Sequence, residues 1–165
     1  MIRALPNSYI VLDLETTGLS AVKDEIIEVA MIKVVNGTPV ETFQALVRPI
    51  RDIPPFITRL TGITNEDVYN AEPVGPVLFH ALNFMEDLPV TGWNVGFDIT
   101  FIKHNTRFFT NRWFDTLPLA RKAFPGLSSY KLSRVAAYLG VRQGTHRALD
   151  DCIAAMDVYE TIRRQ

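Results

Sequence analysis

The sequence has few of the features that cross-link a chain or anchor it in a membrane. Cys152 is the single cysteine among 165 residues, which excludes an intrachain disulfide and a multi-cysteine metal site. A lone cysteine is also typical of a reducing, intracellular compartment. The apolar run near the N-terminus, residues 9–12, is too short for a signal-peptide core or a membrane span. We therefore expect a cytoplasmic protein without a membrane segment.

The chain also lacks a large net charge of either sign. Its formal charge of −1 argues against a protein that coats nucleic acid through bulk charge. The charges are unevenly spread, because residues 1–100 carry 6 Lys and Arg against 13 Asp and Glu, whereas residues 101–165 carry 11 against 5. This asymmetry fits an uneven solvated surface. It fits equally a polyanion that approaches the C-terminal half and needs cations to reach the acidic half.

Length and hydropathy indicate one globular unit. Apolar residues make up 47% of the chain and charged residues 21%, which is typical of a folded rather than a disordered protein. A chain of 165 residues has the size of one ordinary domain and buries enough surface to need no cross-links. We therefore predict a single domain over residues 1–165.

Strand-like and helical patterns alternate along the chain. The nearly unbroken apolar run at residues 9–14 is typical of a central strand buried on both faces, and Asn36-Gly37 is a strong hairpin signal. We predict strands at 9–14, 26–35, 40–47 and 89–93, and helices opening at Pro54-Pro55, at 73–88, after Gly96, and near 116–124, 130–139 and 147–163. This order predicts an α/β layered domain with a mixed sheet, whose ligand site favours the carboxyl ends of parallel strands.

Two carboxylates end the first predicted strand. Asp13 and Glu15 point to the same face, about 7 Å apart, and residues 5–22 contain no lysine or arginine. Carboxylates at the end of a buried strand are costly unless something compensates their charge. A hard divalent cation would do so. Distant arginines or a solvated strand end would do so as well.

The last predicted helix offers a third carboxylate and a histidine. With about 100° per residue, Asp150 falls on the polar face, whereas Asp151 falls at the edge of the apolar stripe. Periodicity therefore favours Asp151 as the functional member of the pair. His146 precedes the helix, where the helix dipole favours the neutral ring. Asp98 opens another predicted helix, where a carboxylate is ordinary on its own because it interacts well with the dipole.

Three short motifs stand in a fixed order along the chain. They are Asp13-Leu14-Glu15 followed by Thr16-Thr17-Gly18, then Asn94 to Asp98, then His146 with Asp151 five residues later. With the segments 24–28, 60–64, 130–132 and 139–140, they make the chain resemble the DEDDh exonucleases, a DnaQ-like group that includes proofreading subunits of replicative DNA polymerases. The resemblance covers residues 9 to about 159. Trp93 departs from it, since many members have histidine there.

The resemblance implies a fold and a mechanism. The fold would be a ribonuclease H-like three-layer α/β domain with a mixed five-stranded sheet flanked by helices. Four residues, Asp13, Glu15, Asp98 and Asp151, would hold two Mg²⁺ or Mn²⁺ ions, which suit oxygen ligands. His146 would be the general base. The reaction would remove nucleoside 5′-monophosphates from the 3′ end of single-stranded or frayed DNA.

The resemblance also implies contacts with the nucleic acid. Thr16, Thr17 and Gly18 would meet the terminal sugar and phosphate, with Gly18 allowing close backbone approach. Thr61 and Asn94 would line the terminal nucleotide. The phosphates further along the strand would meet basic side chains that position without reading sequence, namely Lys131, Arg134, Arg142 and Arg147.

The motifs are compatible with several functions. The motifs do not separate DNA from RNA, so an exoribonuclease or oligoribonuclease fits them too, as does a phosphodiesterase for very short oligomers. A DNA-end trimmer in CRISPR adaptation is another possibility. The chain could act alone, or with a DNA polymerase or another fused or associated protein. A different class is a non-catalytic module that binds a nucleic acid or a partner.

Overall fold

The chain folds around a mixed sheet that places β1 near its centre. The structure, a computed structural model, describes residues 4–165, so the first three residues of the predicted domain lie outside the described part. The strand order is β3-β2-β1-β4. β1 (Tyr9–Thr16) runs antiparallel to β2 (Ile26–Val35) and parallel to β4 (Val90–Thr91). The predicted mixed α/β sheet is confirmed.

β2 and β3 (Thr38–Leu46) form the predicted hairpin. Asn36 and Gly37 connect them with φ values of 51° and 77°. Two consecutive residues in the left-handed region match the twist of the flanking strands, which explains the Asn-Gly pair. The predicted bounds of β2 are confirmed, and β3 begins and ends within two residues of its prediction.

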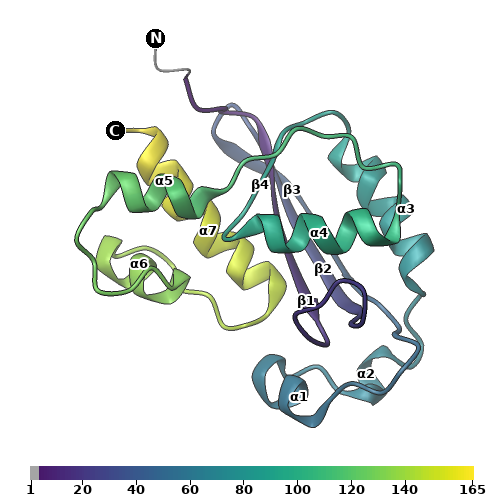
Figure 1. The fold of residues 1–165 in the computed structure, drawn as a ribbon. Helices are drawn as coiled ribbons and strands as arrows, with labels where there is room; N and C mark the ends of the chain where they lie inside the picture. Colours follow the sequence, from purple (N-terminus) through teal and green to yellow (C-terminus); the bar gives the residue numbers. More distant parts are fainter. Residues whose placement is uncertain (1–3) are drawn as a thin grey trace.

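Helices cover both faces of the sheet, which gives the molecule three layers (Figure 1). On one face lie α5 (Thr116–Ala123), α6 (Leu132–Leu139) and α7 (Ala148–Arg163). On the other lie α3 (Val74–Met85) and α4 (Val95–Asn105). These five helices correspond to those that periodicity predicted.

The period of two along β1 decides what each of its side chains meets. Ile10, Leu12 and Leu14 belong to the apolar cluster shared with α3 and α4. Tyr9 and Val11 belong to the cluster shared with α7. Because alternate side chains share a face, the next odd-numbered residues of β1 also face α7. That places the carboxylates of the strand end toward the last helix.

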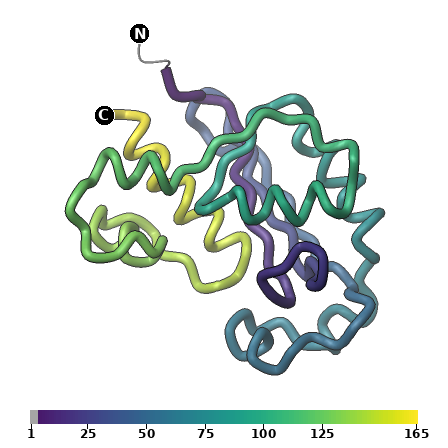
Figure 2. Tube along the Cα trace, in the orientation of Figure 1, coloured from purple at the N-terminus to yellow at the C-terminus, as the bar shows by residue number. Residues whose placement is uncertain are grey.

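Two short helices lie beyond the carboxyl end of β1 (Figures 1 and 2). α1 (Pro55–Thr61) has Pro55 in its first turn, where proline loses no hydrogen bond. α2 (Asn65–Val68) begins at a capping box in which Thr64 and Asp67 bond each other's backbone N–H. The sequence prediction contained α1 and missed α2. Within residues 4–165, no helix is both long enough and apolar enough to cross a membrane.

The predicted fifth strand is wrong, because the sheet formed by residues 4–165 has four strands. A fifth position is reduced to a single parallel bridge between Val90 and Trp113. The chain turns away on both sides of this bridge. β4 ends at Thr91, ahead of Asn94 in the left-handed region, and Asp115 caps α5 two residues after Trp113. The strand predicted at 89–93 is therefore only two residues long.

Candidate active site

Three carboxylates meet where β1 ends and α7 begins. Asp13 and Glu15 project from β1 toward α7, and Asp151 lies in the first turn of that helix. One carboxylate oxygen from each of the three lies within 4.8 Å of the others. Periodicity had placed Asp13 and Glu15 on one face and had favoured Asp151 over Asp150, whereas their meeting at one site was implied by the family resemblance.

Asp98 lies next to this group but outside it. It is buried in the first turn of α4, and its Oδ1 accepts a hydrogen bond of 2.9 Å from the backbone N–H of Leu14. This bond ties the start of α4 to the strand between the two β1 carboxylates. Asp98 is thus adjacent to Asp13 and shares its electrostatic environment.

Burial and mutual repulsion raise the pKa values of the clustered carboxylates. Burial, followed by repulsion from Asp98, Glu15 and Asp151, raises the pKa of Asp13 well above its usual range. Burial and repulsion from Asp151 raise the pKa of Glu15 to about 8. Burial raises the pKa of Asp98 to about 8 and also raises that of Asp151. Carboxylates arranged in this way are poorly compensated by the protein itself.

One carboxylate oxygen lacks any compensating partner. Oδ2 of Asp13 is buried and has no hydrogen-bond partner among residues 4–165. Buried polar atoms without a partner are rare and call for an explanation such as an ion. Oxygen donors gathered around such an atom suit a hard divalent cation. The donor set therefore fits a divalent metal.

The carboxylates open into a cavity of about 620 Å³. Asp13 and Asp151 line it together with Asn94, His146 and Lys131. The remaining lining residues are Trp93, Leu117, Leu132, Ser133 and Gly144. The space beside the acidic cluster is thus lined by both polar and apolar side chains, as ligand sites commonly are.

Two of the predicted site residues hold unusual backbone conformations. Asn94, at the start of α4, has a φ of 53°, and His146, before α7, has a φ of 62°. Asparagine and histidine are found in the left-handed region more often than most other non-glycine residues, yet such positions remain uncommon. Such conformations are costly and cluster at functional sites, where surrounding contacts impose them. Both residues line the cavity.

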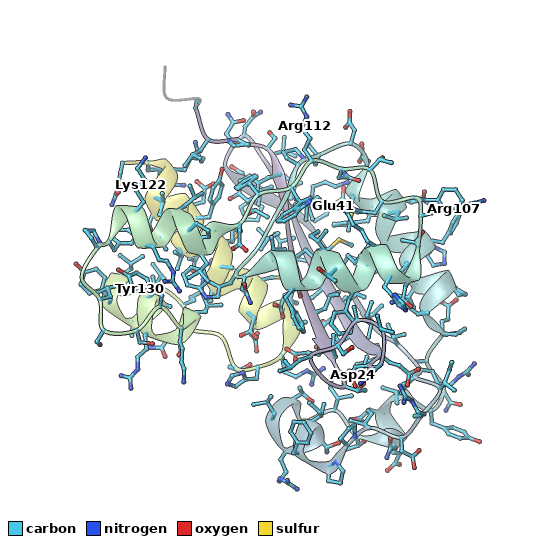
Figure 3. All side chains as sticks on the ribbon, in the orientation of Figure 1. Asp24, Glu41, Arg107, Arg112, Lys122 and Tyr130 are labelled. Atoms are coloured by element: carbon cyan, nitrogen blue, oxygen red, sulfur yellow. The ribbon has the colours of Figure 1, made fainter. Side chains whose placement is uncertain are left out.

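The segment Thr16-Thr17-Gly18 is shaped by its own contacts. The Thr16 hydroxyl donates to the Gly18 carbonyl over 2.7 Å, and the Thr17 hydroxyl accepts from the Glu25 N–H over 2.9 Å. A Cβ on Gly18 would lie 2.3 Å from Oδ2 of Asp24, which Figure 3 shows in the loop after β1. A side chain at position 18 would thus displace the Asp24 carboxylate, which accepts a hydrogen bond from the Ser20 N–H, a reason for glycine that the sequence did not reveal.

Thr61 lies away from the cavity lining. It is buried at the end of α1, where its hydroxyl donates to the Ile57 carbonyl over 2.8 Å and accepts from the Ile63 N–H over 3.1 Å. The structure therefore gives Thr61 a role in terminating α1. Its contact with a nucleotide stays a prediction.

The four basic residues predicted to meet phosphates divide into two pairs. Lys131 lines the cavity and Arg134 is exposed. Arg142 instead forms two hydrogen bonds of 2.8 Å with Asp157. Arg147 pairs with Glu28, a residue that the sequence prediction had not assigned to the site. Its signal was visible, since Glu28 is a charge within the apolar run of β2.

The fold and this centre together define a ribonuclease H-like domain with an acidic site that fits a divalent metal. A family model for exonucleases, RNase_T, matches residues 10–159. Since the match spans nearly the whole chain, the chain belongs to this exonuclease family.

Two curated relatives are similar over most of the chain. The epsilon subunit of DNA polymerase III from Aquifex aeolicus is 38% identical over 161 residues, covering 94% of this chain and 80% of that protein. A PolC-type DNA polymerase III from Clostridium perfringens is 37% identical over 159 residues, covering 93% of this chain. The match spans only 11% of that polymerase, so its whole activity does not transfer.

A solved structure supports the same fold. Exonuclease X in complex with 5′ overhanging duplex DNA superposes with a TM-score of 0.80 and 25% identity, covering 94% of this chain and 91% of that one. The sheet and the helices that carry the acidic cluster therefore belong to a known exonuclease architecture.

Proposed function

We propose that the protein is a divalent-metal-dependent 3′→5′ exonuclease that removes nucleoside 5′-monophosphates from single-stranded or frayed DNA. One observation carries the proposal: the unpartnered buried oxygen of Asp13 lies among carboxylates that converge on a cavity. Such a centre has no structural purpose without a cation. Membership of the exonuclease family supplies the reaction class.

The choice of DNA rests on the relatives. The Aquifex relative is a subunit of a DNA polymerase, and the Exonuclease X structure holds duplex DNA. Neither relative fixes the preference of this chain, because discrimination between DNA and RNA depends on contacts with the 2′-hydroxyl. RNA is therefore the alternative substrate in the test of activity.

The residues of the cavity suit hydrolysis by an activated water. Asp13, Glu15, Asp98 and Asp151 would hold two Mg²⁺ or Mn²⁺ ions. When bound, such ions stabilise the charge that develops on the attacking and leaving oxygens. His146, which lines the cavity, would take the proton of the water at a ring nitrogen. Thr16, Thr17, Gly18, Thr61 and Asn94 would orient the terminal nucleotide.

The test is a time course on 5′-labelled single-stranded DNA and on RNA of the same sequence. Each strand is incubated with Mg²⁺, with Mn²⁺ and with a chelator, and Asp13→Ala is run alongside. We expect a ladder that shortens from the 3′ end, requires metal and is absent in the variant. If neither strand shortens with either metal, the chain is not an exonuclease on its own, and a binding role takes precedence.

We also propose that the chain works beside a DNA polymerase in the cytoplasm, as a subunit or as part of a longer protein. The support is the identity of the relatives. Copurification of the tagged chain with a polymerase from its own cells, tested by primer extension in the eluate, would establish the association.

A further inference from the structure

A buried glutamate outside the proposed metal ligands connects the sheet to the catalytic segment. Glu28 of β2 is 0% exposed and is the antiparallel partner of Glu15 in the sheet register. Its side chain therefore lies on the same face as the acidic cluster, toward α7. A buried carboxylate beside other carboxylates needs strong donors of its own.

Most of those donors come from the segment that carries the proposed general base, while Nε2 of Gln44 donates a longer hydrogen bond of 3.5 Å to Oε2. Oε1 of Glu28 accepts from Nε of Arg147 at 3.3 Å and from the backbone N–H of Ala148 at 3.0 Å. Oε2 accepts from Nη2 of Arg147 at 2.8 Å. Arg147 directly follows His146, and Ala148 is the first residue of α7. A fork of two arginine N–H groups on one carboxylate fixes orientation as well as distance.

This anchor lies between the two functional residues of the segment. On one side, His146 is held at a φ of 62°, a conformation that its neighbours must impose. On the other side, the N–H of Asp151 donates to the Arg147 carbonyl over 3.0 Å. The backbone at Arg147 thus sets the direction of His146 and the start of the helical turn that presents Asp151.

We propose that Glu28 is a positioning residue, which acts through Arg147 to set His146 and Asp151 against the carboxylates of β1. The inference rests on the proposed nuclease function. It also gives Arg147 a purpose other than contact with phosphate. A positioning partner of this kind is expected to change turnover about 10- to 100-fold.

Three variants separate positioning from plain stability. Glu28→Gln keeps the shape and the acceptor for Ala148 but loses the ion pair. Arg147→Met leaves the Glu28 charge buried without its partner and is expected to unfold more easily. The double variant removes both charges, so its stability returns toward that of the wild type. Turnover stays low in the double variant, because the fork that orients the segment is absent.

The measurements are kcat and KM on single-stranded DNA, melting temperature, and amide hydrogen exchange of residues 145–151 in the metal-free protein. We expect kcat to fall about 10- to 100-fold in Glu28→Gln and in the double variant, with a smaller change in KM. Exchange at the start of α7 is expected to become faster in both. Glu160→Gln with Arg163→Met, which removes the ion pair at the other end of α7, is the matched control and should leave kcat unchanged.

The outcomes are distinct. A double variant that regains both stability and turnover overturns the inference, since the pair is then merely structural. Unchanged exchange in both variants overturns it as well. A wild type that cleaves neither DNA nor RNA sinks the proposed function instead, and hydrogen exchange still decides whether Glu28 orders the segment.

Discussion

Glu160, at the C-terminal end of α7, and Asp13, opposite its N-terminal end, are compensated to very different degrees by the chain. At the C-terminal end, Glu160 accepts from the Tyr9 hydroxyl at 2.6 Å and from Nη2 of Arg163 at 2.8 Å, and Arg164 lies 3.3 Å away. Burial would raise the Glu160 pKa, but the bonds from Arg163 and Tyr9 outweigh burial and hold it below its usual value. At the N-terminal end, Asp13 keeps an unpartnered oxygen and a raised pKa.

The contrast separates a carboxylate whose charge the chain itself compensates from one whose charge it leaves for a ligand to compensate. Both groups lie on the α7 face of β1, so burial alone does not separate them. What separates them is compensation by the chain itself, because arginines and a hydroxyl reach Glu160 and none of these reaches Oδ2 of Asp13 among residues 4–165. A site that the protein leaves under-compensated is one that an external cation stabilises.

The largest expected effect is that of Asp13→Asn. We expect nuclease activity to fall about a thousand-fold or more, equivalent to about 4 kcal/mol of activation barrier. The reason is that a charged metal ligand is replaced by a neutral amide, which binds a cation more weakly. We expect the metal-free variant to melt a few degrees higher than the wild type at alkaline pH, because the amide never carries the charge that burial and the neighbouring carboxylates disfavour. Activity and melting temperature measured on the same samples check both signs. A metal-free variant that melts lower would contradict the proposed repulsion.

The next effect is a dependence of stability on pH that metal reverses. Glu15 and Asp98 have pKa values of about 8 in the folded chain, against ordinary values of 4.5 and 3.8. The folded state therefore binds more protons than the unfolded state between about pH 4.5 and pH 8. The free energy of unfolding must fall as pH rises through that window, and the melting temperature must fall with it.

Thermal melts in a chelator and in excess Mn²⁺ measure this profile. Metal is expected to restore the melting temperature at pH 8, where the carboxylates release their protons to bind it. Asp13→Asn serves as the control, with a shallower slope and a smaller response to Mn²⁺. A flat profile in chelator would mean that the cluster is already compensated.

Glu160→Gln, at the other end of α7, is predicted to lower stability and to leave activity nearly unchanged, the reverse of Asp13→Asn. The variant loses charge-assisted hydrogen bonds, and we expect it to be less stable by about 2 kcal/mol, or about 4–8 °C in melting temperature. Nuclease kcat should stay within about twofold of the wild type, since the site is at the opposite end of α7. Thermal melts and single-stranded DNA turnover test this. A large loss of kcat would show that the two ends are coupled.

The sequence was informative about the site wherever periodicity decides a direction. Asp13 and Glu15 face one way because they are two residues apart on a strand, and Asp151 faces them because of its angle on the helix. Asp150 instead accepts a hydrogen bond from the Thr145 hydroxyl. The motifs of the family added Asp98 and His146, which periodicity alone did not single out.

Features that depend on contacts distant in sequence were not predictable in this way. The pairing of Glu28 with Arg147 joins residues 119 positions apart, and the two-residue β4 depends on how the chain turns after Trp113. Short local patterns are also weak signals, since the capping box at Thr64 was too short a pattern to indicate α2. Tertiary packing, rather than propensity, settles such elements.

The smallest expected effect is that of Tyr9→Phe. This variant tests most directly how the charge of Glu160 is compensated. The Tyr9 ring packs edge-on against Tyr159 with centroids 4.7 Å apart, and phenylalanine keeps that contact, so only the hydroxyl is tested. Its loss should cost about 1 kcal/mol, or about 2–4 °C in melting temperature, with turnover unchanged. Combined with Glu160→Gln, the two losses should be less than additive because they share one hydrogen bond. Full additivity in a double-mutant cycle would mean that the hydroxyl and the carboxylate stabilise the chain independently, and the arginines alone would then account for the compensation of Glu160.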